Sequence, residues 1–326
     1  MRPLGLLIGF AADRILGDPQ RFHPVAGFGW AASALERRCY ADSRHHGAAF
    51  TATLVGGTVL IGAVTERATR GQPLAHTLVT AVATWAVLGG RSLEREATAI
   101  DAHLAAGDLA AARRRLTHLV ARETTNLSEY EIARAVVESV AENTSDAVVA
   151  PLFWGAVAGV PGLLGYRAIN TLDAMVGYRN DRYRRFGWAS ARLDDAANLA
   201  PARAGGLLVC AADPAHARAA WRTWRRDAAA HPSPNAGVVE SAFAGALGIR
   251  LGGTNTYHGT VEHRVVMGDG RAPTAADIAR TNALARRVGR AAAASAALLA
   301  FRHLHWNRRK PVTAPSRAQS GTVAPL

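Results

Sequence analysis

The stretch ESVAENTSDAVVAPLFWGAVAGVPGLLGYRAINTLDAMVGYR, from Glu138 to Arg179, places a long apolar run between two groups of polar residues. Residues 147–166 carry no charge, and these 20 residues match the length of an α-helix that crosses a bilayer. Gly159 and Pro161 interrupt the run, and such breaks are tolerated at membrane depth where the backbone lines a cavity. The stretch therefore predicts either a simple crossing or a broken, re-entrant segment.

The polar groups on the two sides of this run are rich in carboxylates. Glu138, Glu142 and Asp146 are four residues apart, so a helix places them on one face, beside Asn143. The residues after the run are Asn170, Asp173, Arg179, Asp194, Asp195 and Asn198. Such side chains are costly to bury without partners, which predicts a functional site. A simple crossing would separate the two groups across the bilayer, whereas a re-entrant segment would let them meet.

Composition narrows the class of protein. The 326 residues carry a net charge of +13, almost all from arginine, which suits nucleic acid, an anionic membrane surface or a small anionic substrate. The arginines are scattered, and arginine-dense segments alternate with very apolar ones. This favours a membrane protein with polar loops, and an alanine-rich soluble helical protein is the alternative. Cys39 and Cys210 fit neither a zinc nor a disulfide pattern and are interpreted as apolar fillers in a reduced compartment.

Further helices are expected on both sides of the central stretch. The uncharged runs 48–64 and 73–90 predict a membrane-spanning helical hairpin, with two buried core helices as the alternative. Residues 91–141 are amphipathic, with a break at Gly107. A third helix of this segment begins near Ser128, which has capping-box spacing to the glutamate three residues later.

The C-terminal third predicts three further features. Trp221 and Trp224 stand among arginines, as in a helix at a membrane interface. A helix from Thr274 ends in an apolar run that is a candidate for a last span. Residues 307–326 have the composition of a disordered tail.

The predicted fold class is all-α, a polytopic helical integral membrane protein with amphipathic helical loops and a broken or re-entrant apolar segment. Residues 1–306 are expected to form a single membrane domain. The first twelve residues resemble the apolar part of a signal peptide but lack a convincing cleavage site, so they are interpreted as part of the mature chain.

The polar residues favour a particular chemistry. The sequence lacks the motifs of P-loop, Rossmann, zinc-protease and serine-hydrolase sites. Carboxylate and amide oxygens suit Mg²⁺, while arginine binds phosphate or carboxylate through two parallel hydrogen bonds. The expected substrate is therefore a phosphorylated or carboxylated small molecule with Mg²⁺. Ordinary ion pairs on helix surfaces are the alternative reading of some of these residues.

Several motifs resemble those of one family. They are DRILGDPQRFHPVAGFGW, RSLEREA, ESVAENTSDAVVAPLFW, NTLDAMVGYR, ARLDDAANLAPAR and HPSPNAGVVESAFAGALG. In this order they are similar to the membrane-bound adenosylcobinamide-phosphate synthases of cobalamin biosynthesis, the CbiB/CobD family, over residues 5–270. LVARET departs from the family pattern at Ala121 and Glu123, and Ala174 stands where a serine is common, which argues against a hydroxyl nucleophile there.

The resemblance implies a reaction and its participants. The reaction is ATP-dependent amide formation between a propionate carboxylate of adenosylcobyric acid and the amine of aminopropanol phosphate or a related amino-alcohol phosphate. It is expected to pass through an acyl phosphate intermediate. ATP and Mg²⁺ are expected, but no haem, zinc or iron–sulfur cluster. The expected partners are these substrates, the lipid bilayer and other membrane-bound late cobalamin enzymes, but no nucleic acid. The chain is expected in the cell membrane, as a multi-pass protein with its active site on the cytoplasmic side.

The resemblance also suggests a role for individual residues. The expected catalytic group is Glu138, Glu142, Asp146, Asp173 and Arg179, and the metal ligands among the acids are Glu142, Asp146, Asp173 and Asp195. Glu138 or His23 is the candidate acceptor of the amine proton. The expected substrate-binding residues are His23, Asn143, Arg167, Asn170, Arg192, Asn198, Asn235, Glu240, Asn255 and Tyr257.

Two other functions fit the sequence in part. A membrane transporter or sensory component without ligase activity would also place acids and arginines among its spans. A soluble helical nucleic-acid binder would explain the charge, but the scattered arginines form no recognisable binding motif.

Overall fold

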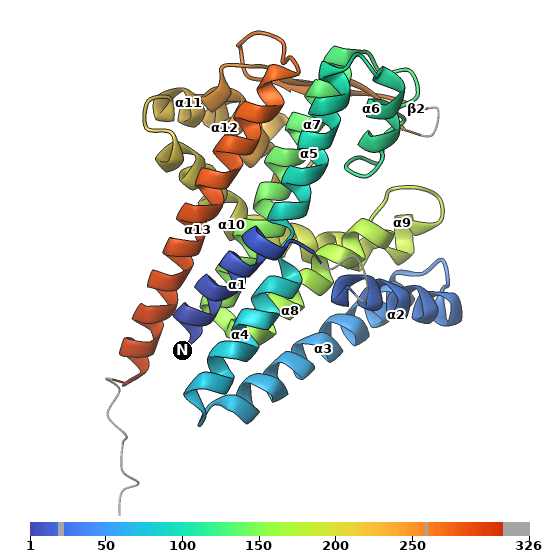
Figure 1. Ribbon diagram of the computed structural model, residues 1–326. Helices are drawn as coiled ribbons and strands as arrows, with labels where there is room; N and C mark the ends of the chain where they lie inside the picture. The colour runs from blue at the N-terminus through green and yellow to red at the C-terminus, as the bar shows by residue number, and fades with distance from the viewer. Residues whose placement is uncertain (19–22, 258–259, 309–326) are drawn as a thin grey trace, which may run out of the picture.

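The computed structural model describes residues 1–18, 23–257 and 260–308, and it is helical apart from one β-hairpin (Figure 1). Its elements are α1 (Arg2–Leu16), α2 (Pro24–Cys39), α3 (Arg44–Thr69), α4 (Pro73–Val87), α5 (Gly90–Ala105), α6 (Leu109–Leu116), α7 (Glu129–Thr144), the π-helical turn η1 (Ser145–Val149), α8 (Ala150–Val176), α9 (Tyr183–Phe186), α10 (Trp188–Ala212), α11 (Ala217–Asp227), the 3₁₀ turn η2 (Ala228–Ala230), α12 (Ala236–Leu247), β1 (Leu251–Tyr257), β2 (Thr260–Met267) and α13 (Ala276–Arg308). The predicted tail from residue 309 onward lies outside the described residues.

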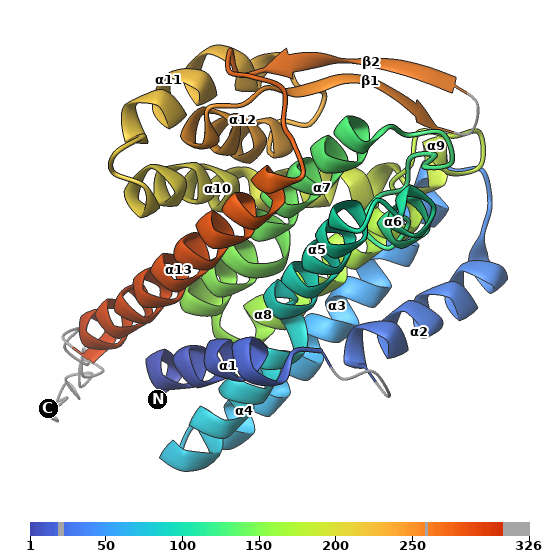
Figure 2. The same ribbon diagram turned by 45° about the horizontal axis from the view of Figure 1, so that its top comes forward.

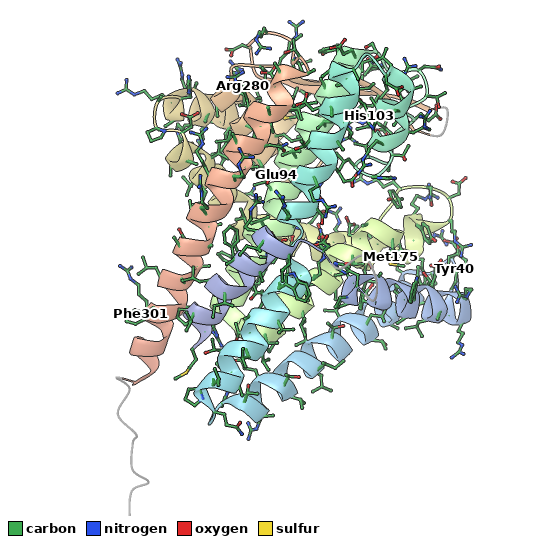
Figure 3. All side chains as sticks on the ribbon, in the orientation of Figure 1. Tyr40, Glu94, His103, Met175, Arg280 and Phe301 are labelled. Atoms are coloured by element: carbon green, nitrogen blue, oxygen red, sulfur yellow. The ribbon has the colours of Figure 1, made fainter. Side chains whose placement is uncertain are left out.

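The prediction of an all-α membrane protein is confirmed. Three helical stretches in the described part of the chain are long and apolar enough to cross a membrane, Arg44–Thr69, Pro73–Ala105 and Glu129–Val176. The helix α13, which carries the candidate last span, is not among them. Large apolar side chains are exposed on α3 and α4, with Leu74 at 72%, and on α13 at Phe301. Figure 3 shows mostly carbon on the lower part of the molecule and polar tips on the upper part.

The apolar run of residues 147–166 is re-entrant, which is one of the two alternatives that the sequence predicted. The chain passes from α7 through η1 into α8 and reverses at Gly159, whose φ is 72° and ψ is −148°. Ala150 and Tyr166 share one buried cluster, whereas 16 residues of straight helix would separate them by about 24 Å. The two halves of α8 therefore form a helical hairpin that returns the chain to the side from which it came.

A buried ion pair holds the reversal. Val160 donates its backbone N–H to Glu66 Oε2 at 2.8 Å, and Arg2 Nη2 lies 2.8 Å from Glu66 Oε1. Glu66 is buried near the end of α3, and the hairpin packs against that helix. The amide freed by the break in the helix thus has a charged acceptor, which satisfies it inside an apolar region.

The amphipathic segment folds as predicted. Gly107, with φ of 71°, ends the turn after α5, and Asp108 caps α6 by accepting from the Ala111 N–H at 2.9 Å. Ser128 and Glu131 form the capping box that begins α7. Asp108 thereby fixes the start of α6, and the capping box fixes the end of the loop between α6 and α7.

The hairpin of β1 and β2 is the one element in the described residues that departs from the all-α prediction. The strands pair antiparallel, with an irregularity between Leu251 and Gly253. Figure 2 shows the hairpin crossing above α7 and α12. Arg134 of α7 donates to the backbone carbonyls of Gly252 and Thr254, which ties the hairpin to the helix that carries the acidic face. Gly252 and Gly253 have φ of 87° and 100°, so this strand does not show the usual alternation.

The two tryptophans on α11 differ in their exposure to solvent. Trp221 is 43% exposed, as an interfacial residue would be. Trp224 packs inward against Gly206 of α10. Only one of the two predicted interfacial side chains therefore faces outward.

Candidate functional site

The re-entrant hairpin brings the two acidic groups into one site. Two adjoining cavities, of about 670 Å³ and about 180 Å³, have Glu142, Asp146 and Asp173 in common. The helix α7 with η1 supplies the first two of these residues, and the returning half of α8 supplies the third. The two groups lie on one side of the reversal, so the alternative of a simple crossing is excluded.

The smaller cavity is a chamber of acids and amides. Its polar lining consists of Glu142, Ser145, Asp146, Asp173, Asp194, Asp195, Asn198, Ser233 and Asn235. None of the described side chains that line it is basic. Asp146 and Asp173 lie close enough to Asp194 for their charges to repel. The chamber therefore favours a bound cation.

Asp194 is the best-defined acid of this chamber. Its Oδ2 accepts from Asn198 Nδ2 at 3.0 Å, and Asn198 Oδ1 accepts from the Tyr166 hydroxyl at 2.9 Å. Its Oδ1 is buried and has no hydrogen-bond partner. Burial raises the pKa of Asp194 to about 6, while hydrogen bonds from the side chains of Asn198 and Asn170 oppose the shift. An ion bound at the free oxygen would stabilise the charged form.

Asn235 and Asp195 close the chamber on its other side. Asn235 donates to the Asp195 carbonyl at 2.8 Å and accepts from Arg203 Nη1 at 2.9 Å. Asp195 also lies 3.5 Å from Arg192, whose side chain is 63% exposed. Arg192 is therefore at the rim, where it balances one acid.

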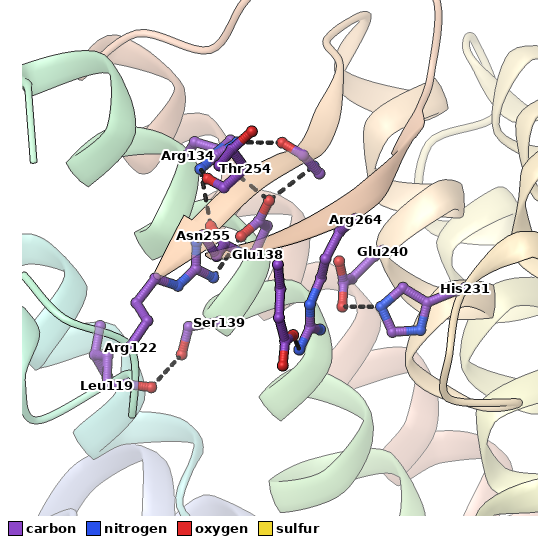
Figure 4. Close-up of polar contacts among 12 residues, drawn as sticks. Leu119, Arg122, Arg134, Glu138, Ser139, His231, Glu240, Thr254, Asn255 and Arg264 are labelled. Carbon is purple, nitrogen blue, oxygen red and sulfur yellow. Dashed lines mark hydrogen bonds and ion pairs between the residues drawn. The ribbon is translucent and has the colours of Figure 1, made fainter. Parts of the chain in front are cut away.

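The larger cavity places arginines opposite glutamates (Figure 4). Arg122 donates to Glu138 Oε2 at 2.5 Å and to Asn255 Oδ1 at 2.6 Å. The Gly252 N–H donates to Glu138 Oε1 at 2.8 Å. Arg134 donates to Asn255 Oδ1 at 2.9 Å. Glu138 and Asn255 are thus fixed parts of a network that positions Arg122 at the cavity wall.

A second part of this wall is built from Arg264 and Glu240. Arg264 comes from β2 and reaches into the cavity in Figure 4. Glu240, on α12, is buried, and its Oε1 lies 3.8 Å from His231 Nε2. Burial, followed by repulsion from Glu142 and the nearby Glu138, raises the pKa of Glu240 well above its usual range. Burial lowers the pKa of His231.

Several predicted residues lie elsewhere. His23 does not line either cavity; it caps α2 by accepting from the Val25 N–H at 3.1 Å, and burial lowers its pKa. Arg179 is exposed on the loop after α8. Arg167 is partly buried near Asp146 but is not part of either lining. The side chain of Tyr257 lies outside the described residues.

The remaining predicted residues line the site. Asn143 and Asn170 belong to the larger cavity, and Asn198 and Asn235 belong to the smaller one. Asn143 donates to the carbonyl of Ser139 at 2.9 Å, so its amide oxygen is turned away from its own helix.

Four basic residues of the larger cavity were not predicted, namely His118, Arg122, His231 and Arg264. Arg122 lies in a loop and Arg264 on a strand, where no helical spacing connects them with the acids. Ser139 of α7 fixes the loop by donating to the Leu119 carbonyl at 3.1 Å. Such a contact follows from the tertiary fold and has no signal in the local sequence.

The acids fit Mg²⁺ with its own water or phosphate ligands better than a metal held by protein alone. Across residues 1–18, 23–257 and 260–308, no group of three or more His, Cys, Asp or Glu side chains is arranged to hold a metal ion. Mg²⁺ usually keeps several waters and binds one or two carboxylates together with substrate phosphates. The orphan Oδ1 of Asp194 and the repelling neighbours Asp146 and Asp173 match that manner of binding.

The fold and the site together define a helical membrane protein with a buried acidic cavity walled on one side by arginines. A family model described as CobD/Cbib protein matches residues 6–285. The chain belongs to the CobD/CbiB family.

Three relatives illustrate the similarity, and each is named Cobalamin biosynthesis protein CobD. The Mycobacterium tuberculosis protein is 52% identical over 305 residues, which cover 92% of this chain and 96% of the relative. The Chromobacterium violaceum protein is 44% identical, covering 87% and 91%. The Rhodobacter capsulatus protein is 42% identical, covering 86% and 92%. No solved structure matches this chain.

Proposed function

We propose that this protein acts in cobalamin biosynthesis as an ATP-dependent ligase. It would join the amine of aminopropanol phosphate, or of a related amino-alcohol phosphate, to a propionate carboxylate of adenosylcobyric acid through an amide bond. The observation that supports this most is the meeting of Asp146 and Asp173 in a cavity that also contains arginines. The relatives' names support the pathway.

The two cavities suit the two halves of such a reaction. A carboxylate resists attack by an amine because its anion is a poor electrophile and oxide is a poor leaving group. Transfer of the terminal phosphoryl group of ATP to that carboxylate gives an acyl phosphate, which the amine then attacks with release of phosphate. Phosphoryl transfer depends on positioning and on charge stabilisation. Arg122 and Arg264 would hold the anionic phosphate groups in the larger cavity.

The acids of the smaller chamber would hold Mg²⁺. We assign this role to Asp146, Asp173 and Asp194, with Asp195 beside them, because these carboxylates repel one another and have no basic neighbour in the chamber lining. Glu142 lines both cavities, and Arg264 is the cation that interacts most strongly with its carboxylate, so Glu142 lies between the acids of the chamber and the arginines of the larger cavity. Bound Mg²⁺ would neutralise the phosphate oxygens.

We also propose where the protein lies in the cell. The chain would lie in the cell membrane with the cavity open to the cytoplasm, where ATP is available. Substrates with phosphate or carboxylate groups would be attracted by the net charge of +13.

The test uses purified, detergent-solubilised protein with ATP, Mg²⁺, adenosylcobyric acid and aminopropanol phosphate. Wild type should form the amide with ATP consumed in proportion, which a transporter would not do. Asp146→Asn and Asp173→Asn should abolish coupling while the protein still inserts and folds. Asp42→Asn, which removes a carboxylate that is 57% exposed, is the matched control. Turnover close to wild type in both cavity variants would overturn the metal assignment.

A further inference from the structure

The pair of Glu240 and His231 is the part of the cavity that the metal and phosphate assignments do not use. Glu240 lies on α12 with its side chain 8% exposed, and His231 precedes that helix with its side chain 3% exposed. Both line the larger cavity. Neither residue lines the chamber of acids, so neither is positioned to bind the metal ion.

The ring of His231 is held so that Nε2 faces Glu240. At its other nitrogen, Ser233 offers a backbone N–H at 3.0 Å and a carbonyl oxygen at 3.2 Å from Nδ1. The ring is therefore anchored in either neutral tautomer. Its Nε2 is buried without a hydrogen-bond partner and points toward Glu240 Oε1, 3.8 Å away. The histidine can thus donate to a charged Glu240 or accept from a protonated one.

The other carboxylates are less suited to accept a proton. Both oxygens of Glu138 already accept hydrogen bonds, one from Arg122 and one from the Gly252 N–H. Asp146 and Asp173 face the chamber assigned to the cation. His23, the other sequence-based candidate, caps α2 outside both cavities.

The groups around Glu240 come from four parts of the chain. Glu138 and Glu142 face it from α7 and repel its negative charge. Arg264 from β2 and Arg122 from the loop before α7 attract it less strongly than burial and the two acids oppose it. His231 completes the set. A buried carboxyl group in such surroundings resists ionisation until a cationic partner, such as an ammonium group, comes close.

We propose that Glu240 accepts the proton from the amine of the amino-alcohol phosphate, and that His231 is the positioning residue that orients it. This inference rests on the ligase function proposed above. The substrate arrives as an ammonium ion, whose charge favours the ionised form of Glu240, and Glu240 releases its own proton to water. The ammonium group then passes one nitrogen proton to the Glu240 carboxylate. The free amine attacks the acyl phosphate carbon, forming the C–N bond. The C–O bond to phosphate then breaks, phosphate leaves with the electron pair, and the second nitrogen proton passes to phosphate or water.

The experiment separates the two halves of the reaction by changing the nucleophile. Hydroxylamine is largely uncharged near neutral pH, so it traps an acyl phosphate as a hydroxamate without an enzymatic base. Glu240→Gln should form hydroxamate from adenosylcobyric acid and ATP at a rate close to wild type. Its ligation of aminopropanol phosphate should fall by roughly 10²- to 10⁴-fold, the usual contribution of a general base.

Further variants and a change of pH also test the role of Glu240. The defect of Glu240→Gln should shrink as pH rises, because more of the amine then arrives as free base. Glu240→Asp should recover part of the ligation rate, and His231→Asn should slow ligation less than Glu240→Gln while leaving hydroxamate formation unchanged. Glu129→Gln, an exposed substitution at the start of α7, is the control.

The outcomes distinguish this inference from the proposed function. Hydroxamate and amide lost together in Glu240→Gln, or ligation unchanged in it, would overturn the role of Glu240 while wild-type turnover upholds the ligase. Wild type that forms neither product would overturn both.

Discussion

The reversal at Gly159 should tolerate a side chain poorly. With φ of 72° and ψ of −148°, an alanine there would adopt a backbone conformation that is essentially confined to glycine, which costs about 1–3 kcal/mol. Its Cβ would lie 2.6 Å from Arg2 Nη2 and closer still to Glu66 Oε2. Moving Glu66 breaks a buried ion pair and removes the acceptor of the Val160 amide, which costs about 3–5 kcal/mol.

The sum, about 4–8 kcal/mol, is a large fraction of the stability of an ordinary domain. Gly159→Ala should therefore lower the apparent melting temperature in detergent by roughly 10 °C or more, followed by tryptophan fluorescence. Gly57→Ala on α3 is the matched control, because no atom lies within 4 Å of its new Cβ. A Gly159→Ala protein that melts within about 2 °C of wild type would refute the reasoning, since neither strain nor the lost ion pair would then matter.

Three other substitutions or treatments test separate parts of the structure. Burial raises the pKa of Asp13 from 3.8 to about 6, so between these pH values the native state binds more protons than the unfolded state, and stability falls as pH rises. Asp13→Asn should remove this fall, which is worth about 3 kcal/mol. A pH profile of unfolding that is unchanged in the variant would contradict this prediction. Asn198→Leu removes the partner of the Tyr166 hydroxyl and one hydrogen bond to Asp194, and it should destabilise the protein by about 2–5 kcal/mol, measured by thermal unfolding. Mg²⁺ at 100 times its Kd should stabilise the wild-type protein by about 2.7 kcal/mol, seen as a higher melting temperature, and Asp146→Asn should lose this stabilisation. Equal increases in the melting temperature of both proteins would place the ion elsewhere.

The acidic groups could be predicted from the sequence because helical spacing alone puts Glu138, Glu142 and Asp146 on one face. The break at Gly159 could also be predicted, since glycine and proline close together seldom continue a helix. What spacing does not give is the direction of the chain after the break. That direction depends on Glu66, 93 residues earlier, which accepts the freed Val160 amide.

The basic side of the site shows where sequence reasoning stops. Arg122 is placed by contacts with Glu138 and Asn255, and Arg264 by the β-hairpin, neither of which has a periodic pattern. His23 shows the opposite case, because a residue that the sequence suggested for the site does not line either cavity. Its neighbouring proline marks the start of a helix, and the histidine serves as the cap of α2 rather than as part of the cavity.

The β-hairpin is therefore a component of the site and not an addition to the helical fold. Without it, Glu138 loses the Gly252 N–H and the cavity loses Arg264, so the glutamates of α7 face one another with less opposing charge. Repulsion among them would then favour protonation or separation of the carboxylates, and either change removes the anionic side of the cavity. The helices bring the acids together, and the hairpin supplies much of the charge that makes their proximity stable.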